Sequence, residues 1–194
     1  MRELMGRMRR GDERFLLYVI ARRYGALDRS VLLLTHLGGA AVTISISILM
    51  LAVPSPGWNE AGRLAAFALV GSHLCVQVLK RSIARARPHL PVGIHSLVEA
   101  PDRFSFPSGH AAAALSVALG AASAMPASAP WLLGLAGLVG ASRCYLGVHY
   151  PGDVLAGWIL AGSAFLAGSA FLAGSAFAGS AFLAGSTFLA GAWI

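Results

Sequence analysis

The sequence has few charged residues for its length. Only 12% of its 194 residues are Asp, Glu, Lys or Arg, whereas 57% are hydrophobic. A soluble globular domain carries charge on about a quarter of its residues, so the composition argues against this class. Several apolar runs reach the roughly 20 residues that a helix needs to cross a bilayer. The composition therefore predicts a helical membrane protein.

Acidic residues and cysteines are also scarce. The chain has eight acidic residues and two cysteines, and Asp153 is the only acidic residue after Asp102. Two cysteines do not indicate a disulfide framework. A protein-bound metal ion needs several carboxylate, imidazole or thiolate ligands close together, and no segment offers a convincing set. We therefore expect an activity without a metal ion or other cofactor.

The positive charge is concentrated beside the apolar runs. The formal net charge is +7, and eight of the 15 basic residues precede Ser30, while four more lie within residues 80–87. Basic clusters that flank apolar spans are typical of the cytoplasmic side of membrane proteins, and an anionic membrane surface attracts them. This distribution predicts the bilayer as partner and argues against nucleic acid. It leaves the oligomeric state open.

The apolar runs predict an all-α fold, a polytopic transmembrane helix bundle with five or six spans. The predicted spans are residues 31–53, 64–79, 108–126 and 131–146, and a fifth that begins near residue 151. Residues 12–24 mix apolar and basic positions over a length too short to span, which predicts an amphipathic helix on the membrane surface. We divide the chain into a basic N-terminal segment (1–30), a membrane-embedded core (31–160) and a low-complexity tail (161–194).

The tail repeats units such as AGSAFL and contains no charged residue. Its phenylalanines recur every five or six residues, a period that does not match the 3.6-residue helical turn, so successive rings rotate onto different faces. We interpret the tail as a membrane anchor. It forms either one span with an overhanging end or two spans with a tight turn.

Two charged residues and two histidines interrupt the apolar second half of the chain. Between Phe104 and the C-terminus only Arg143 and Asp153 carry formal charge, and His110 and His149 share the stretch. Charged groups at membrane depth are costly, so their presence usually marks function. The alternative is that each lies at a helix end and reaches the interface. Their neighbours favour function, because they follow a pattern.

Three short motifs make up this pattern. Residues 80–88 read KRSIARARP, residues 107–110 read PSGH, and residues 142–153 contain Ser-Arg, then His149 and then Asp153. In order, spacing and position at the ends of spans, the motifs resemble those of the type 2 phosphatidic acid phosphatase family, which shares its fold and site with vanadium haloperoxidases. The resemblance covers about residues 64–160. It implies an integral-membrane enzyme that hydrolyses a lipid phosphate.

The basic residues of the first and third motifs suit a phosphate ligand. Lys80 and Arg87 are seven residues apart, close to two helical turns, so both can point the same way if the segment is helical. Arg143 comes from another span, and guanidinium groups match phosphate oxygens well. The resemblance assigns these three residues to phosphate binding. Arg81 and Arg85 fall outside the motif, and we interpret them as a basic cluster that holds the span in register.

The second motif opens an alanine-rich helix. Serine is a favoured N-cap, glycine lets backbone N–H groups approach an anion closely, and a helix N-terminus attracts anions. The resemblance implies that Ser108 and Gly109 contact the phosphate and that His110 protonates the leaving oxygen. Taken alone, the motif favours an ordinary cap with His110 at the interface.

The third motif pairs an imidazole with a carboxylate. His149 and Asp153 are four residues apart and share a face if the segment is helical. A carboxylate bonded to one imidazole nitrogen leaves the other free to attack phosphorus. The resemblance implies that His149 forms a phosphohistidine, that Asp153 orients it, and that His110 then assists the attacking water. The alternative is that Asp153 only stabilises a helix N-terminus.

The spans also predict which side of the membrane holds the motifs. If residues 31–53 and 64–79 both cross, Lys80 returns to the side of the basic N-terminus, which points to the cytoplasm. We therefore expect a multi-pass protein of the bacterial inner membrane with a cytoplasmic active site. The candidate substrates are a polyprenyl-linked phosphate or diphosphate, a phosphorylated polyprenyl-phospho-sugar and a phosphatidate-type lipid. The alternatives are a vanadate-dependent haloperoxidase-like enzyme and a non-catalytic membrane protein.

Overall fold

The structure is a computed structural model that describes residues 2–100 and 102–191. Within these ranges it is helical and contains no strand, which confirms the all-α prediction. The helices are α1 (Arg2–Ala21), α2 (Gly25–His36), α3 (Ala40–Ala52), α4 (Pro56–Ile83), α5 (Gly109–Ala124), α6 (Ala129–Tyr145) and α7 (Pro151–Gly191), with a short 3₁₀ helix at Pro126–Ser128.

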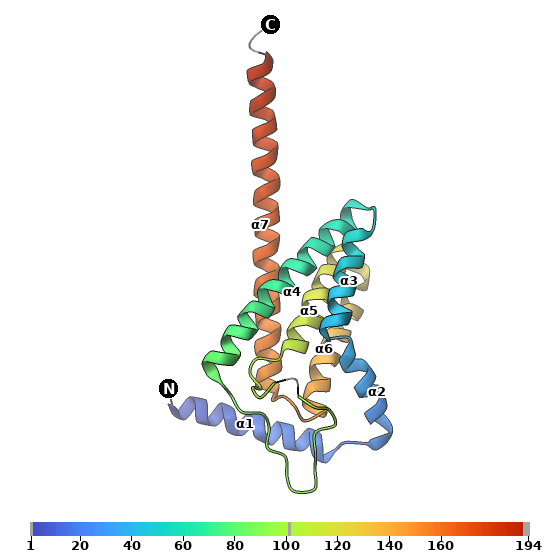
Figure 1. The fold of residues 1–194 in the computed structure, drawn as a ribbon, viewed down its shortest axis with the longest axis vertical. Coiled ribbons are helices and arrows are strands. Elements are labelled where there is room, and N and C mark those ends of the chain that lie inside the picture. Colours follow the sequence, from blue (N-terminus) through green and yellow to red (C-terminus); the bar gives the residue numbers. More distant parts are fainter. Residues whose placement is uncertain (1, 101, 192–194) are drawn as a thin grey trace.

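Helices α3 to α6 and the first half of α7 pack side by side, and α1 lies across one end of this bundle (Figure 1). The central helix is α5, which contacts α3, α4, α6 and α7. Its small residues permit these close approaches: a Cβ atom at Gly120 would lie 2.5 Å from the Cβ of Ala65 in α4. Small residues at helix contacts are the usual way for membrane helices to pack tightly.

The structure contains fewer long apolar helices than we predicted. Helix α4 and the Pro151–Ser175 part of α7 are long and apolar enough to cross a membrane. Helices α2 and α3 give a third candidate if the pair, bent by 48°, counts as one span. Helix α5 is apolar but has only 16 residues, short of the roughly 20 that a span needs. The described residues therefore form a helical membrane protein with two or three candidate spans, and the expected five or six are not confirmed.

The predicted span over residues 31–53 is bent in the structure. The chain bends between His36 and Ala40, where Gly38 and Gly39 stand. Glycine is among the least favourable residues inside a helix. A Cβ atom at Gly38 would lie 2.7 Å from the carbonyl oxygen of His110, so this glycine lets α2 approach the start of α5. The break thus brings the N-terminal half of the chain close to the second motif.

The structure gives more exact boundaries for the first and last helices than the sequence did. Helix α1 begins earlier than the predicted amphipathic segment, and its buried Leu16 and Ile20 pack in one cluster with Cys144 and Val154. At the other end, α7 continues without a turn to Gly191, so the tail follows the single-helix alternative (Figure 1).

Candidate active site

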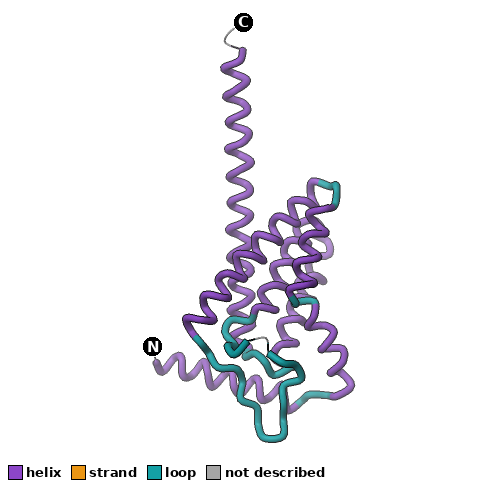
Figure 2. The backbone as a smooth tube through the Cα atoms, in the orientation of Figure 1, coloured by secondary structure: helices purple, strands orange, loops and turns teal. Residues whose placement is uncertain are grey.

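The three motifs lie at the same end of the bundle, where α1 crosses it (Figure 1). The first motif ends α4, the second begins α5, and the third joins α6 to α7. The loop segments of residues 84–100 and 102–108 run over this end (Figure 2). Segments that are far apart in the sequence therefore meet here.

His149 lies in the loop between α6 and α7, and its side chain is almost fully buried. The Nε2 atom is 3.3 Å from Nη1 of Arg87. A guanidinium group can only donate hydrogen bonds, so in this contact Nε2 is the acceptor and Nδ1 carries the proton. Nδ1 faces Oδ2 of Asp153 at 3.6 Å, slightly beyond hydrogen-bond range. The arrangement presents the Nε2 lone pair to the cationic side of the site.

Burial also keeps this imidazole neutral. It lowers the pKa of His149 to about 4, the positive charges of Arg87 and Arg143 act in the same direction, and Asp153 opposes them. A neutral ring is the form that can attack an electrophile.

Asp153 is completely buried and held from three sides. Its Oδ2 accepts from the backbone N–H of Tyr150 at 2.8 Å, its Oδ1 accepts from Nη1 of Arg85 at 2.8 Å, and its backbone carbonyl accepts from the N–H of Ser108 at 2.9 Å. The bond to Tyr150 is a helix-capping contact at the start of α7. Asp153 therefore stabilises the helix N-terminus and faces His149 at the same time.

Lys80 and Arg87 converge on one carboxylate. The Nζ atom of Lys80 donates to Oδ2 of Asp102, and Nη2 of Arg87 donates to Oδ1 of Asp102 at 3.0 Å. The two residues do not lie on one helix face as their spacing suggested, because α4 ends at Ile83 and Ala84 adopts a left-handed conformation with φ of 48°. The chain reverses there, and the loop returns Arg87 to Lys80.

Arg143 lies in the last turn of α6. It is buried, its Nη1 donates to Oγ1 of Thr35 in α2 at 2.7 Å, and its Nε has no hydrogen-bond partner. Its charge acts on both Arg87 and His149. We call Lys80, Arg87 and Arg143 the cation cradle.

The second motif borders the cradle. Ser108 is buried and caps α5, and its Oγ accepts from the N–H of Ala111 at 3.5 Å, as the sequence predicted. Gly109 is the first residue of α5. The positive charges of Arg143 and Lys80 act on His110, so it lies close to the same cluster. The roles of these residues toward phosphate stay predictions.

The sequence-based interpretation of Arg85 as a register residue is wrong. Its guanidinium joins Asp153 to Asp12 of α1, with 2.8 Å contacts to each carboxylate, and lies over the ring of Tyr150. Asp12 also accepts from the N–H of Gly152 at 2.9 Å. No sequence signal linked Asp12 to the third motif, because this contact exists only after α1 has docked.

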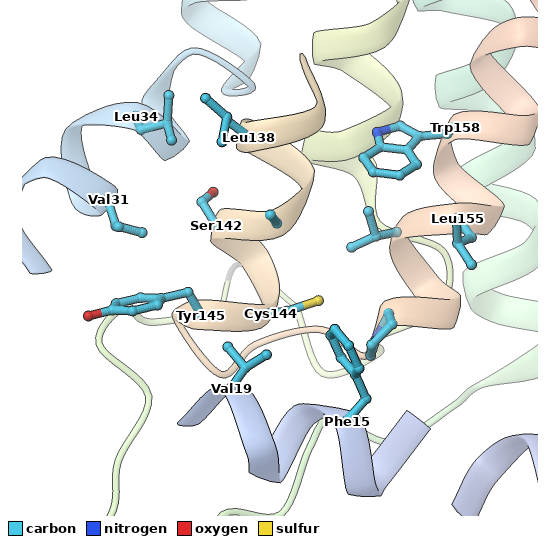
Figure 3. Close-up of a pocket in the computed structure, with 13 residues that line it drawn as sticks. Phe15, Val19, Val31, Leu34, Leu138, Ser142, Cys144, Tyr145, Leu155 and Trp158 are labelled. Atoms are coloured by element: carbon cyan, nitrogen blue, oxygen red, sulfur yellow. The ribbon is translucent and has the colours of Figure 1, made fainter. Parts of the chain in front are cut away.

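Two cavities adjoin this end of the bundle. The larger, about 440 Å³, is apolar and lies between α1, α2, α6 and α7 (Figure 3). Its walls include Ser142 and Cys144, which flank Arg143, and Trp158 of α7. The smaller, about 310 Å³, lies beside Arg87 and is lined by polar loop residues such as His89 and His95. Across the part of the chain that the structure describes, no three His, Cys, Asp or Glu side chains gather as a candidate metal site.

Comparison with known proteins identifies the family. The sequence model of the PAP2 superfamily matches residues 61–186, which contain all three motifs. The chain belongs to the PAP2 superfamily, as the motifs predicted.

Similar proteins carry the names of lipid phosphatases. The chain is 32% identical to a decaprenylphosphoryl-5-phosphoribose phosphatase of Mycobacterium tuberculosis over 67% of its own length and 72% of that protein's. It is 44% identical to an undecaprenyl-diphosphatase of Sulfolobus acidocaldarius, but the match covers only 43% of this chain and 42% of that protein.

Solved structures share the fold. A transmembrane PAP2-type phosphatidylglycerolphosphate phosphatase from Bacillus subtilis is 28% identical and superposes with a TM-score of 0.68, covering 84% of this chain and 85% of that one. LpxE of Aquifex aeolicus, at 23% identity and the same TM-score, covers 80% of this chain and 92% of its own, and supports the fold alone.

Proposed function

We propose that the protein is an integral-membrane phosphatase that hydrolyses a lipid phosphate through a phosphohistidine. The observation that carries the proposal is the orientation of His149: its Nε2 faces Arg87 of the cation cradle while its Nδ1 faces Asp153. Family membership supports the same chemistry.

In the proposed reaction the cradle binds the phosphate oxygens, and Nε2 of His149 attacks phosphorus. The N–P bond forms as the P–O bond to the lipid breaks, and His110 gives a proton to the departing oxygen. Asp153 stabilises the positive charge that develops on the imidazole. Water then attacks phosphorus while His110 accepts a proton from this water, the N–P bond to His149 breaks, and inorganic phosphate leaves. Because phosphoryl transfer depends mainly on positioning and charge stabilisation, these residues suffice without a metal ion.

For the substrate we propose a lipid whose phosphate is attached to a polyprenyl chain, directly, as a diphosphate, or through a sugar. The names of two relatives support this class, and the apolar cavity between α1, α2, α6 and α7 offers a hydrocarbon surface next to Arg143. Phosphatidic acid and phosphatidylglycerophosphate are the competing substrates, the second supported by a Bacillus subtilis relative.

Purified protein in detergent is expected to release phosphate from at least one polyprenyl-linked phosphate and to keep this activity in excess EDTA. A panel with decaprenyl phosphate, undecaprenyl diphosphate, phosphatidic acid and phosphatidylglycerophosphate would rank the substrates. Halide oxidation by added hydrogen peroxide in the presence of vanadate, without phosphate release, would favour the haloperoxidase alternative. Loss of turnover on chelation, restored by Mg²⁺, would contradict the metal-independent mechanism.

We also propose that the site faces the cytoplasm of a bacterial inner membrane. The site and the basic helix α1 lie at one end of the bundle, and the turn between α3 and α4 lies at the other (Figure 1). In a Cys75→Ser, Cys144→Ala background, an impermeant thiol reagent added to intact cells is expected to label Gly57→Cys, near that turn, and to spare Ser96→Cys, in the loop over the site. The opposite pattern would place the site outside.

A further inference from the structure

The carboxylate of Asp102 occupies two members of the cation cradle. It receives a charge-assisted hydrogen bond from Lys80 on one oxygen and from Arg87 on the other. Nε of Arg87 also donates to the backbone carbonyl of Asp102 at 2.8 Å. An anionic group of the protein itself thus lies on the side chains that would receive a phosphate.

This carboxylate is ionised at neutral pH. Burial alone would raise the pKa of Asp102, but the hydrogen bond and charge of Lys80, the charge of Arg87 and the N–H of Phe104 lower it below its ordinary value. Lys80 and Arg87 of the cation cradle are therefore paired with a fully ionised carboxylate.

Four of the five N–H donors of Arg87 are already engaged. Nε donates to the carbonyl of Asp102, Nη1 contacts the carbonyl of Val148 and Nε2 of His149, and Nη2 donates to the Asp102 carboxylate. A phosphate that bound Nε and Nη2 of this guanidinium together would compete with Asp102 for these two donors. Its oxygens would also lie against a carboxylate of like charge, which is unfavourable.

Asp102 can leave more easily than the other carboxylate of the site. Its side chain is 37% exposed and belongs to the loop over the bundle end, whereas Asp153 is completely buried. Withdrawal of Asp102 would return its charge to water, so the step carries no penalty for a buried unpaired charge.

We propose that Asp102 is the resident counter-ion of the cation cradle: substrate phosphate displaces its carboxylate from Lys80 and Arg87, and this exchange sets the apparent affinity for phosphate. The inference rests on the proposed function. It makes Asp102 an affinity-determining residue that opposes binding, in contrast to the cations beside it.

The test compares Asp102→Asn with Glu99→Gln. Asparagine keeps the shape of Asp102 and an oxygen for the N–H of Phe104, which Asp102 now binds at 3.0 Å. Glu99→Gln removes the same charge from an exposed position of the same loop. For inhibition of lipid phosphate turnover by inorganic phosphate, the Ki of Asp102→Asn is expected to fall roughly tenfold, because two partly exposed ion pairs no longer compete. The KM should fall in parallel, and Glu99→Gln should keep the wild-type values.

A second measurement follows the loop directly. Trypsin cleavage after Arg103 is expected to accelerate when inorganic phosphate is added to the wild type, since Asp102 is released, and to be fast without phosphate in Asp102→Asn. An unchanged or higher Ki in Asp102→Asn, an equal fall in Glu99→Gln, or cleavage that ignores phosphate would overturn the inference. If the wild type hydrolyses no lipid phosphate, the proposed function fails, while the cleavage assay still tests Asp102.

Discussion

Replacing His149 by alanine is expected to reduce phosphate release by on the order of 10³-fold or more, because loss of a nucleophile removes the covalent route. The structure motivates the expectation: the buried imidazole directs Nε2 toward Arg87 and Nδ1 toward Asp153. The measurement is the rate of phosphate release by purified protein from its best lipid substrate. A matched control is His73→Ala, which removes an exposed histidine of α4 outside the three motifs.

The same pair of variants tests the intermediate. Brief reaction with a ³²P-labelled substrate, followed by alkaline quenching, should leave label on the wild type and on His73→Ala but not on His149→Ala. Because burial lowers the pKa of His149 to about 4, its ring should stay neutral and competent from neutral pH down to about that value. Equal release by the wild type and His149→Ala would remove this residue from the mechanism.

Replacing Arg143 by alanine is expected to lower kcat/KM by roughly 10²- to 10³-fold, the usual cost of removing one group that stabilises transition-state charge. Arg143→Lys should be intermediate, since lysine keeps the charge but loses the planar fork. The variants are compared by kcat/KM for the lipid and by the Ki of inorganic phosphate, which should rise in both.

A purely structural role for Arg143 would give a different result. Its Nη1 binds Oγ1 of Thr35 and so joins α6 to α2. If this bond were its whole contribution, Thr35→Val would lower activity as strongly as Arg143→Ala. We expect Thr35→Val to retain most of the activity, and Arg63→Ala, at an exposed position on α4, to retain all of it.

The ion-pair chain from Asp12 through Arg85 to Asp153 links the N-terminal helix to the carboxylate that faces His149. Each step is a 2.8 Å contact, and Arg85 keeps only about a fifth of its side chain exposed. Ion pairs with little solvent exposure hold a specific geometry, since breaking one leaves a charge without its partner. Helix α1 therefore helps to support the third motif from outside the region that the family motifs cover.

The sequence alone determined the membrane class, the all-α fold and the family, and it predicted the residues of the candidate site, because these depend on composition and on short local spacings. It predicted the capping role of Ser108 and the start of α7 at Pro151 for the same reason. It did not predict the bend at Gly38 and Gly39. The bend accompanies the close approach of Gly38 to His110 in α5, and an apolar run in the sequence does not indicate which other helix it will contact.

Only the tertiary structure decided how the charges pair. The sequence indicates only a register role for Arg85 and no partner for Asp102, yet Arg85 bonds Asp153, and Asp102 bonds Lys80 and Arg87. These contacts join residues from 15 to 68 positions apart. Electrostatic pairing depends on distance in space and on burial, and both are set by how α1, the α4–α5 loop and α7 come together.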